Sequence, residues 1–333
     1  MSLAINTATP EGLVIAADSR QSYRNQKGAS RIGSDSASKL FSINKRVGVA
    51  TTGLAFIPEN GIPKNISKFI DQFTRELAVD NLSVKEIAEG LYKFFNNKLN
   101  WREQLNQLPD QVKSNFIQQG FEILETKIEK YNIRFKIKDK GGNVKEGVAG
   151  IDGLVLFVAG YNLNGSHEVY NIHIPGEIIK RRDGKERGME YGANWIGQSD
   201  VVSRIIKGWD VRMLNIPFVN QAVQHLGQQG IENQLNGLEY SINWGTMSLQ
   251  DAIDFSILAI QTTSAIQRFS DGIQTDPGDV PGVGGPVDVA VITLDKGFVW
   301  VSKKNLFANN NVVNLDNYEN LKKAKIKKIS GEK

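Results

Sequence analysis

The first fifty residues alternate between short apolar runs and polar breaks. Apolar runs at residues 3–8 and 13–17 flank Thr9-Pro-Glu-Gly12, whose proline presets φ and whose glycine tolerates a positive φ. A second pair of runs, residues 39–43 and 47–52, flanks the polar residues 44–46. This pattern predicts two β-hairpins, and therefore four strands, before the first helix.

The apolar spacing then changes to that of helices. Apolar side chains recur every three or four positions at Ile66, Phe69, Ile70, Phe73 and Leu77. This spacing predicts a helix over about 65–78. Ser83 and Glu86 have the spacing of a capping box, and apolar residues continue beyond them, so a second helix is predicted over about 83–98.

The middle of the chain is less regular. Residues 100–150 are more polar and predict an insertion with a helix near 110–130 and a turn at Asp139-Lys-Gly-Gly142. Strand-like runs at residues 154–159 and 168–174 are joined through Asn164-Gly165, a strong hairpin signal. A helix is expected over about 200–207, and residues 210–246, rich in Asn, Gln and Gly, are interpreted as a second insertion.

The last third of the chain predicts one helix and one hairpin. Ser248 and Asp251 begin an amphipathic helix to about Phe269, and runs at residues 287–293 and 297–302 follow a glycine-rich loop. This order of elements favours an α+β fold, a four-layer αββα sandwich of two antiparallel sheets covered by helices, over a doubly wound sheet. We expect one domain over residues 1–308 and a lysine-rich tail over 309–333.

Composition excludes several kinds of chemistry. The 333 residues contain no cysteine and three isolated histidines, so we expect no disulfide, thiolate nucleophile, iron–sulfur cluster or other metal site. No apolar run is long enough to span a bilayer and no secretory signal is evident, so we expect a cytoplasmic protein without a membrane partner.

The net charge of +4 comes from one end of the chain. Residues 322–333 hold six lysines and one glutamate, and without them the chain is close to neutral. A basic tail of this kind is not a phosphate-binding face, so we expect no nucleic-acid partner.

Common catalytic motifs are absent, but the beginning of the chain carries an unusual arrangement. There is no GxxxxGK[ST] or GxSxG motif, and no GxGxxG between a strand and a helix. The features that remain are Gly12-Leu-Val-Ile-Ala-Ala-Asp-Ser-Arg20, Ser38-Lys-Leu-Phe-Ser-Ile43, Gly48-Val-Ala-Thr-Thr-Gly53 and, near the other end, Gly284-Gly-Pro-Val-Asp-Val-Ala290.

In residues and order, these motifs resemble the β-type subunits of the proteasome and the simpler bacterial proteasome-like peptidases, within the N-terminal nucleophile hydrolases. The resemblance implies that Ser2, freed by removal of Met1, is the nucleophile and that its own α-amine is the base. Lys39 would favour the alkoxide and lower the pKa of the amine, and Asp18 would orient Lys39.

Further roles follow from the same resemblance. Arg20 would brace this network, and the backbone N–H of Gly53 would donate to the oxyanion. Ser199 and Asp279 stand near the family's supporting residues, with Gln198 as an alternative to Ser199. The substrate-binding residues implied are Ser22, Thr51 and Ala55.

The chain departs from the family in two respects. About five extra residues separate Arg20 from Lys39, which places an insertion within residues 21–36 beside the expected cleft. The nucleophile is serine, whereas threonine is the usual residue of the proteasome class.

The expected function is hydrolysis of amide bonds in peptides or proteins through an acyl-enzyme at Ser2, with no metal or organic cofactor. Because family members assemble into rings, the resemblance also implies a homo-oligomer, and it leaves an ATPase partner open. Two alternatives remain: a small-molecule amidase on the same fold, and an inactive structural or binding subunit that retains Met1.

Overall fold

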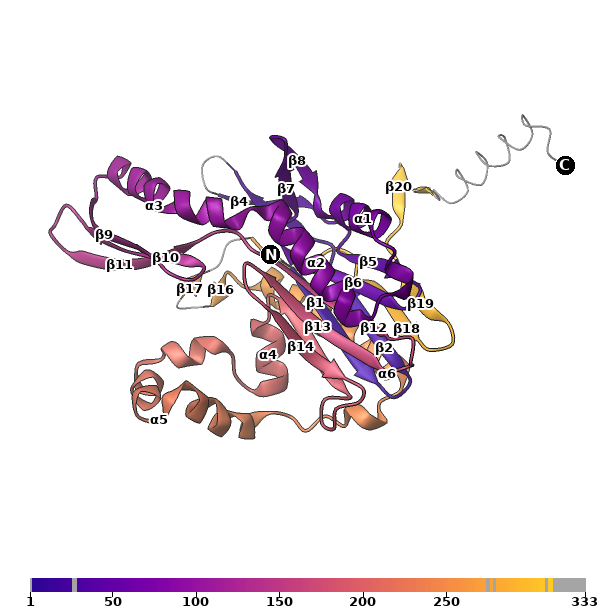
Figure 1. Cartoon of the computed structure of the whole chain (residues 1–333). Helices are drawn as coiled ribbons and strands as arrows, with labels where there is room; N and C mark the ends of the chain where they lie inside the picture. Colours follow the sequence, from indigo (N-terminus) through magenta and orange to yellow (C-terminus); the bar gives the residue numbers. More distant parts are fainter. Residues whose placement is uncertain (1, 26–28, 274–275, 278–279, 309–310, 314–333) are drawn as a thin grey trace, which may run out of the picture.

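The computed structural model describes residues 2–25, 29–273, 276–277, 280–308 and 311–313 (Figure 1). Met1, Asp279 and residues 314–333 of the predicted tail lie outside the described residues. No helix of the described part is long and apolar enough to cross a membrane.

Two five-stranded antiparallel sheets form the body of the molecule. The first sheet has the order β15 (Gly192–Gly197), β1 (Leu3–Thr9), β2 (Gly12–Ala17), β18 (Asp288–Thr293) and β19 (Gly297–Ser302). The second has the order β14 (Ile178–Asp183), β13 (His167–Ile174), β12 (Leu154–Tyr161), β6 (Val47–Gly53) and β5 (Leu40–Asn44). The four main predicted hairpins are confirmed, whereas the edge strands β14 and β15 were not predicted because charged residues and glycines interrupt their apolar pattern.

Residues from both sheets share one buried cluster. Ile15 and Ala290 of the first sheet meet Ala50 and Phe157 of the second in it. The sheets approach closely at Gly48 of β6, because a Cβ atom at this position would lie only 2.8 Å from the side chain of Ile15 in β2. The buried faces of the two sheets therefore pack against each other.

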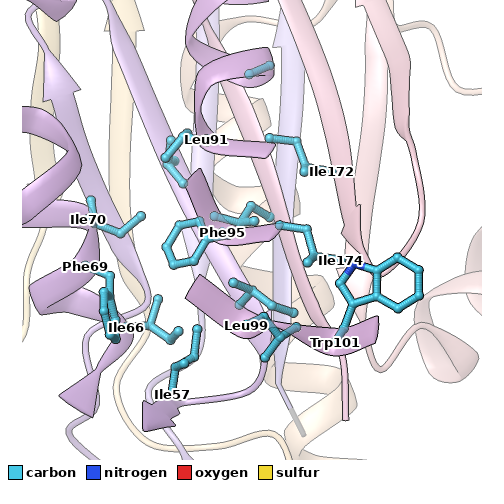
Figure 2. Packing of buried hydrophobic residues seen from close by; sticks show 14 of the residues in the cluster. Ile57, Ile66, Phe69, Ile70, Leu91, Phe95, Leu99, Trp101, Ile172 and Ile174 are labelled. Carbon is cyan, nitrogen blue, oxygen red and sulfur yellow. The ribbon is translucent and has the colours of Figure 1, made fainter. Parts of the chain in front are cut away.

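Two predicted helices cover the outer face of the second sheet. They are α1 (Ile66–Glu76) and α2 (Val84–Leu99), and the Ser83–Glu86 capping box begins α2 as expected. Figure 2 shows Phe95 and Leu91 of α2 in one cluster with Ile172 of β13 and with residues of α1. The apolar stripe seen in the sequence is therefore the buried face of each helix.

The outer face of the first sheet is covered by α4 (Asp200–Lys207) and α6 (Leu249–Phe269), both close to their predicted bounds. Ala252 and Ile260 of α6 and Val202 of α4 pack with Leu3 and Val14 of the first sheet. A second capping box, Ser248 with Asp251, begins α6.

The prediction for residues 100–150 was wrong in part. Helix α3 (Trp101–Gln118) ends before 120, and β9 (Glu122–Ile128), β10 (Asn132–Lys138) and β11 (Val144–Gly150) form a three-stranded sheet beside it (Figure 1). Gly120, at a φ of 82°, ends the helical region, and pairing with β10 holds β9 in an extended conformation.

Residues 210–246, which the sequence analysis interpreted as a second insertion, contain one α-helix with a break in it. Helix α5 (Pro217–Leu235) is interrupted at Gly227, whose φ of 71° and ψ of 160° are not helical. Short 3₁₀ helices occur at Val79–Asn81, Val211–Asn215, Asn236–Leu238 and Trp244–Thr246.

The expectation of four strands before the first helix was also wrong. Two further hairpins, β3 (Gln21–Arg24) with β4 (Ser30–Ser34) and β7 (Phe56–Glu59) with β8 (Ile62–Asn65), precede α1. They are two-stranded ribbons whose short strands have no continuous apolar pattern. The other short pairs are β16 (Gly272–Ile273) with β17 (Asp276–Pro277) and β20 (Leu306–Ala308) with β21 (Asn311–Val313).

Candidate active site

A pocket lies at the beginning of β1 and the end of β6, beside the start of β5. Of the ten residues predicted for the site, seven line it: Ser2, Arg20, Ser22, Lys39, Thr51, Gly53 and Ala55. Asp18 lies behind this lining and has no exposed surface. Ser199 is at the start of α4, outside the lining, and Asp279 is not among the described residues.

The carboxylate of Asp18 accepts four hydrogen bonds. Its Oδ1 accepts from the Leu3 backbone N at 3.0 Å and from Lys39 Nζ at 2.6 Å. Its Oδ2 accepts from the backbone N of Arg20 at 3.1 Å and of Gly284 at 3.0 Å. Because β1 pairs with β2 up to Ala17, Asp18 follows directly at the end of this ladder, next to Ser2. The carboxylate therefore connects the backbone of three segments of the chain behind the pocket.

Lys39 lines the same pocket as Ser2, with 7% of its surface exposed. Its ammonium donates to Asp18 and, at 2.5 Å, to the carbonyl of Arg20, which leaves the third of its protons for the pocket. The pKa of Lys39 is lowered, chiefly by burial and further by the charges of Lys304 and Arg20, although the charge and hydrogen bond of Asp18 act in the opposite direction.

Ser2 is 5% exposed and is held through its backbone. Its carbonyl accepts from the Gln198 backbone N at 2.7 Å. Gly197 has a φ of 92°, and a Cβ there would lie 2.0 Å from the Ser2 carbonyl oxygen. Only glycine therefore allows the end of β15 to approach the beginning of β1 this closely.

Gly53 ends β6 in a similar way. Its φ is 88°, and a Cβ there would lie 2.2 Å from the carbonyl oxygen of Gly153. The next residue, Leu54, donates from its backbone N to that carbonyl at 3.0 Å. The backbone of Gly53 is thereby held in one position in the wall of the pocket.

Arg20 has a partner that the sequence did not indicate. Its Nε and Nη2 donate to the two carboxylate oxygens of Asp35 at 2.6 Å and 3.1 Å. Asp35 belongs to the extra segment between Arg20 and Lys39, which is the one signal that could have drawn attention to it. The Arg20 guanidinium lowers the pKa of Asp35 by hydrogen bonding. Arg20 thus connects the extra segment to the site, and among the described residues its guanidinium donates to Asp35 and to the Pro281 carbonyl and not to Asp18.

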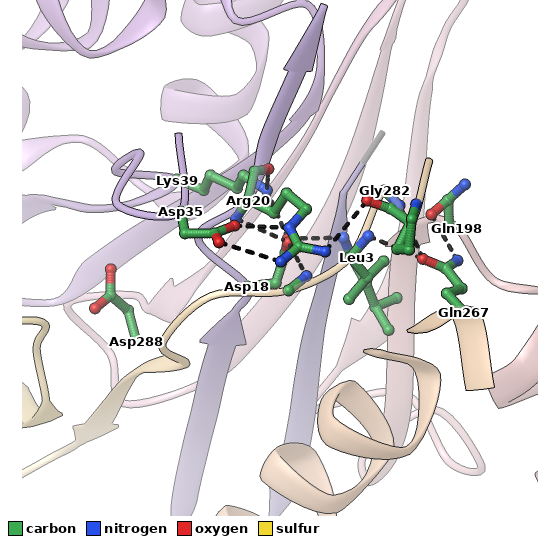
Figure 3. Close-up of polar contacts among 12 residues, drawn as sticks. Leu3, Asp18, Arg20, Asp35, Lys39, Gln198, Gln267, Gly282 and Asp288 are labelled. Atoms are coloured by element: carbon green, nitrogen blue, oxygen red, sulfur yellow. Dashed lines mark hydrogen bonds and ion pairs between the residues drawn. The ribbon is translucent and has the colours of Figure 1, made fainter. Parts of the chain in front are cut away.

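Gln198, which donates from its backbone N to the Ser2 carbonyl, is connected through its side chain to Gln267 of helix α6 (Figure 3). Gln267 Nε2 donates to Gln198 Oε1 at 2.7 Å. Gln267 Oε1 accepts from the backbone N of Gly282 at 3.0 Å and of Val283 at 2.9 Å. Sequence reasoning missed Gln267, although it continues the buried stripe of Ile260 and Thr263 as a polar residue at helical spacing.

An open groove of about 1040 Å³ continues from the pocket. Five residues line both the groove and the pocket: Gln21, Ser22, Gly53, Leu54 and Ala55. Tyr23, Phe56 and Asp152 line only the groove. The hairpins β3–β4 and β7–β8 form its sides. In the part of the chain that the structure describes, no three His, Asp or Glu residues are grouped so that they could hold a metal ion.

Comparisons with solved structures give likenesses that include two Anbu proteins. No protein-family model matches this chain, and no curated protein matches it. A Gly-1 mutant of Anbu from Hyphomicrobium sp. strain MC1 is 11% identical, with a TM-score of 0.46 over 100% of this chain and 98% of that one. Anbu from Yersinia bercovieri, described as an ancestral beta-subunit, is 13% identical, with a TM-score of 0.45 over 91% of this chain and 88% of that one. Because both TM-scores are below 0.5, the argument for the function of this chain comes from its own residues.

Proposed function

We propose that this chain is a proteasome-like N-terminal nucleophile hydrolase that cleaves amide bonds of peptides through Ser2, on an αββα sandwich. The observation that carries the proposal is the buried Lys39–Asp18 ion pair, whose lysine lines the same pocket as Ser2 and Gly53. The packing of two sheets with helices on their outer faces is consistent with it.

The proposed reaction begins once Met1 has been removed. The α-amine of Ser2 takes the proton from Oγ as Oγ attacks the carbonyl carbon of the substrate. The Gly53 N–H donates to the oxyanion that forms. The C–N bond then breaks, the α-ammonium returns its proton to the leaving amine, and water hydrolyses the remaining ester.

Lys39 has two tasks in this scheme. Its charge stabilises the alkoxide and lowers the pKa of the neighbouring amine, and Asp18 holds it in one orientation. The four hydrogen bonds to Asp18 support this assignment because they leave the carboxylate little freedom to turn.

The inner pocket favours apolar side chains before the scissile bond. Thr51 and Ala55 are small, and the two cations of the pocket are paired, Lys39 with Asp18 and Arg20 with Asp35. Buried apolar surface contributes about 25 cal/mol per Å², whereas a charged side chain would find no partner there. We therefore expect faster cleavage after Leu, Tyr or Phe than after Arg or Asp in a fluorogenic peptide panel.

The proposal is tested by covalent labelling. We expect the intact mass of the purified chain to lack Met1 and to rise by one equivalent of a peptide epoxyketone, with the adduct on Ser2. Ser2→Ala should not be labelled, whereas Ser36→Ala, which removes an exposed hydroxyl outside the pocket, should be labelled as the wild type. An unlabelled chain that retains Met1 would favour the inactive subunit, and labelling with cleavage of small acyl amides alone would favour the amidase.

A further inference from the structure

A second pocket lies where edge strands of the two large sheets meet, and it shares no lining residue with the candidate active site. Arg182 of β14 donates from Nη2 to the carbonyl of Ala193 on β15 at 2.9 Å. Arg181 Nε donates to Asn194 Oδ1 at 3.2 Å. Strand β14 is thereby connected to β15, and the end of α4 and the segment after α5 complete the walls.

Positively charged side chains outnumber negatively charged ones in the lining of this pocket. Arg181, Arg182 and Lys207 line it with only one carboxylate, Glu239. Among the described residues, no carboxylate lies within 4.0 Å of any of these three cations. The pocket therefore has a formal excess of two positive charges.

Arg182 is the most constrained of the three cations. Its guanidinium lies against Gly192, where a Cβ would come 2.2 Å from Nη2, and its Nη1 donates to the Arg181 carbonyl at 3.2 Å. Its Nε is buried and has no hydrogen-bond partner among the described residues. Burial and the neighbouring Arg181 lower the pKa of Arg182. Since a half-buried cation is costly without a counter-charge, the arrangement is typical of a site whose anion comes from outside.

The aromatic residues of the pocket indicate that the ligand also contains a planar group. Trp195 and Trp244 line the pocket, and Lys207 Nζ lies 5.9 Å from the centre of the Trp195 ring. Indole rings offer flat apolar surfaces on which a planar group can stack. A phosphate monoester carries a charge of about −1.5 to −2 at pH 7, which matches the excess of two, and guanidinium groups bind its oxygens in pairs.

We propose that this pocket binds a small molecule that carries both a phosphate monoester and a planar aromatic ring, as a nucleoside monophosphate does. Arg181 and Lys207 contact the phosphate, Arg182 supplies fixed positive charge behind it, and the indoles hold the ring. The site is independent of the proposed hydrolysis at Ser2.

The test uses tryptophan fluorescence of the full chain, because two of the five tryptophans line the pocket. The probes are AMP, adenosine, which has the ring without the phosphate, and inorganic phosphate, which has no ring. We expect saturable quenching by AMP, none by adenosine over the same range, and weaker binding of phosphate in competition with AMP.

Variants separate the pocket from general surface charge. Arg181→Gln and Lys207→Gln should each weaken AMP binding about ten- to a hundredfold, as expected for loss of one charged hydrogen bond. The matched control is Lys185→Gln, since Lys185 is an exposed cation near the same strand and does not line the pocket. A response to AMP that does not saturate, equal binding of adenosine, or equal weakening by Lys185→Gln would overturn the proposal. Circular dichroism confirms that each variant is folded.

Discussion

Lys39 and Asp18 are two opposite charges that are stable in the interior only together. The ion pair is 2.6 Å long, and its side chains are 8% and 0% exposed. Removing one partner of such a pair leaves the other charge buried, which generally costs several kcal/mol. Here three backbone N–H groups still contact Asp18 when Lys39 is absent.

We therefore expect Lys39→Ala to remain folded, with the free energy of unfolding lowered by about 1–3 kcal/mol, and to lose at least about 100-fold in peptide hydrolysis. Urea unfolding and a fluorogenic assay measure the two effects. Lys45→Ala, at an exposed position in the turn before β6, should change neither. Full activity of Lys39→Ala would show that the assigned network is wrong.

Asp35 provides a test by pH. Its pKa is lowered by Arg20, so its ionised form stabilises the folded state above the unfolded pKa of about 3.9, and this stabilisation is lost as the pH falls through the lower folded value. We expect Asp35→Asn to be less sensitive to acid than the wild type between about pH 5 and 2. The difference at pH 7 should stay below about 1 kcal/mol, because the Asp35 side chain is 48% exposed.

Urea unfolding at several pH values measures this difference. Asp71→Asn, which removes an exposed carboxylate of α1, is the control and should retain the acid sensitivity of the wild type. If Asp35→Asn and the wild type lose stability in parallel on acidification, the Arg20–Asp35 pair does not form in solution.

At the scale of elements, one side chain of α6 connects two loops of the candidate site. Gln267 holds the turn that contains Gly282 and Val283, and the next residue, Gly284, donates from its backbone N to Asp18. Through Gln198 the same amide also connects to the strand end that holds the Ser2 carbonyl. Gln267 is therefore a positioning residue for both the nucleophile and the carboxylate.

We expect Gln267→Leu to lower kcat about tenfold with a smaller change in KM, since a misplaced nucleophile affects the reaction more than substrate binding. Gln267→Glu keeps the acceptor for the two backbone N–H groups and should retain more activity than Gln267→Leu. Gln261→Leu, at an exposed position of α6, is the control. Equal kinetics for Gln267→Leu and Gln261→Leu would contradict the positioning role.

At the scale of the whole molecule, the contact between the two sheets determines whether the pocket exists. The site takes Ser2 and Asp18 from the first sheet, and Lys39 and Gly53 from the beginning and the end of neighbouring strands of the second. Phe157 has no exposed surface and lies in the cluster shared by both sheets.

We expect Phe157→Ala to lower the free energy of unfolding by about 3–5 kcal/mol because it leaves a cavity between the sheets. Phe269→Ala, which truncates a ring that is 77% exposed, should cost much less. Chemical denaturation measures both. Equal losses in the two variants would contradict the packing of the sheets on each other.

The sequence by itself determined most local elements. The N-terminal hairpin, both capping boxes and helices α1, α2, α4 and α6 follow from patterns within about twenty residues, because turn chemistry, capping and apolar period act over short distances. The motifs that carry Asp18, Lys39 and Gly53 could also be recognised in the sequence, and in the structure Lys39 and Gly53 line one pocket while Asp18 pairs with Lys39 behind it.

Only the tertiary structure decided which distant segments meet. Strand β1 pairs with β15, Arg20 with Asp35, and Gln267 with Gln198, across separations that no local pattern records. The same is true of the pocket formed by Arg181, Arg182 and Lys207, whose side chains come from β14 and α4. The spacing of apolar residues indicates which face of a helix or strand is buried. Which other element covers that face depends on the free energy of packing the whole chain.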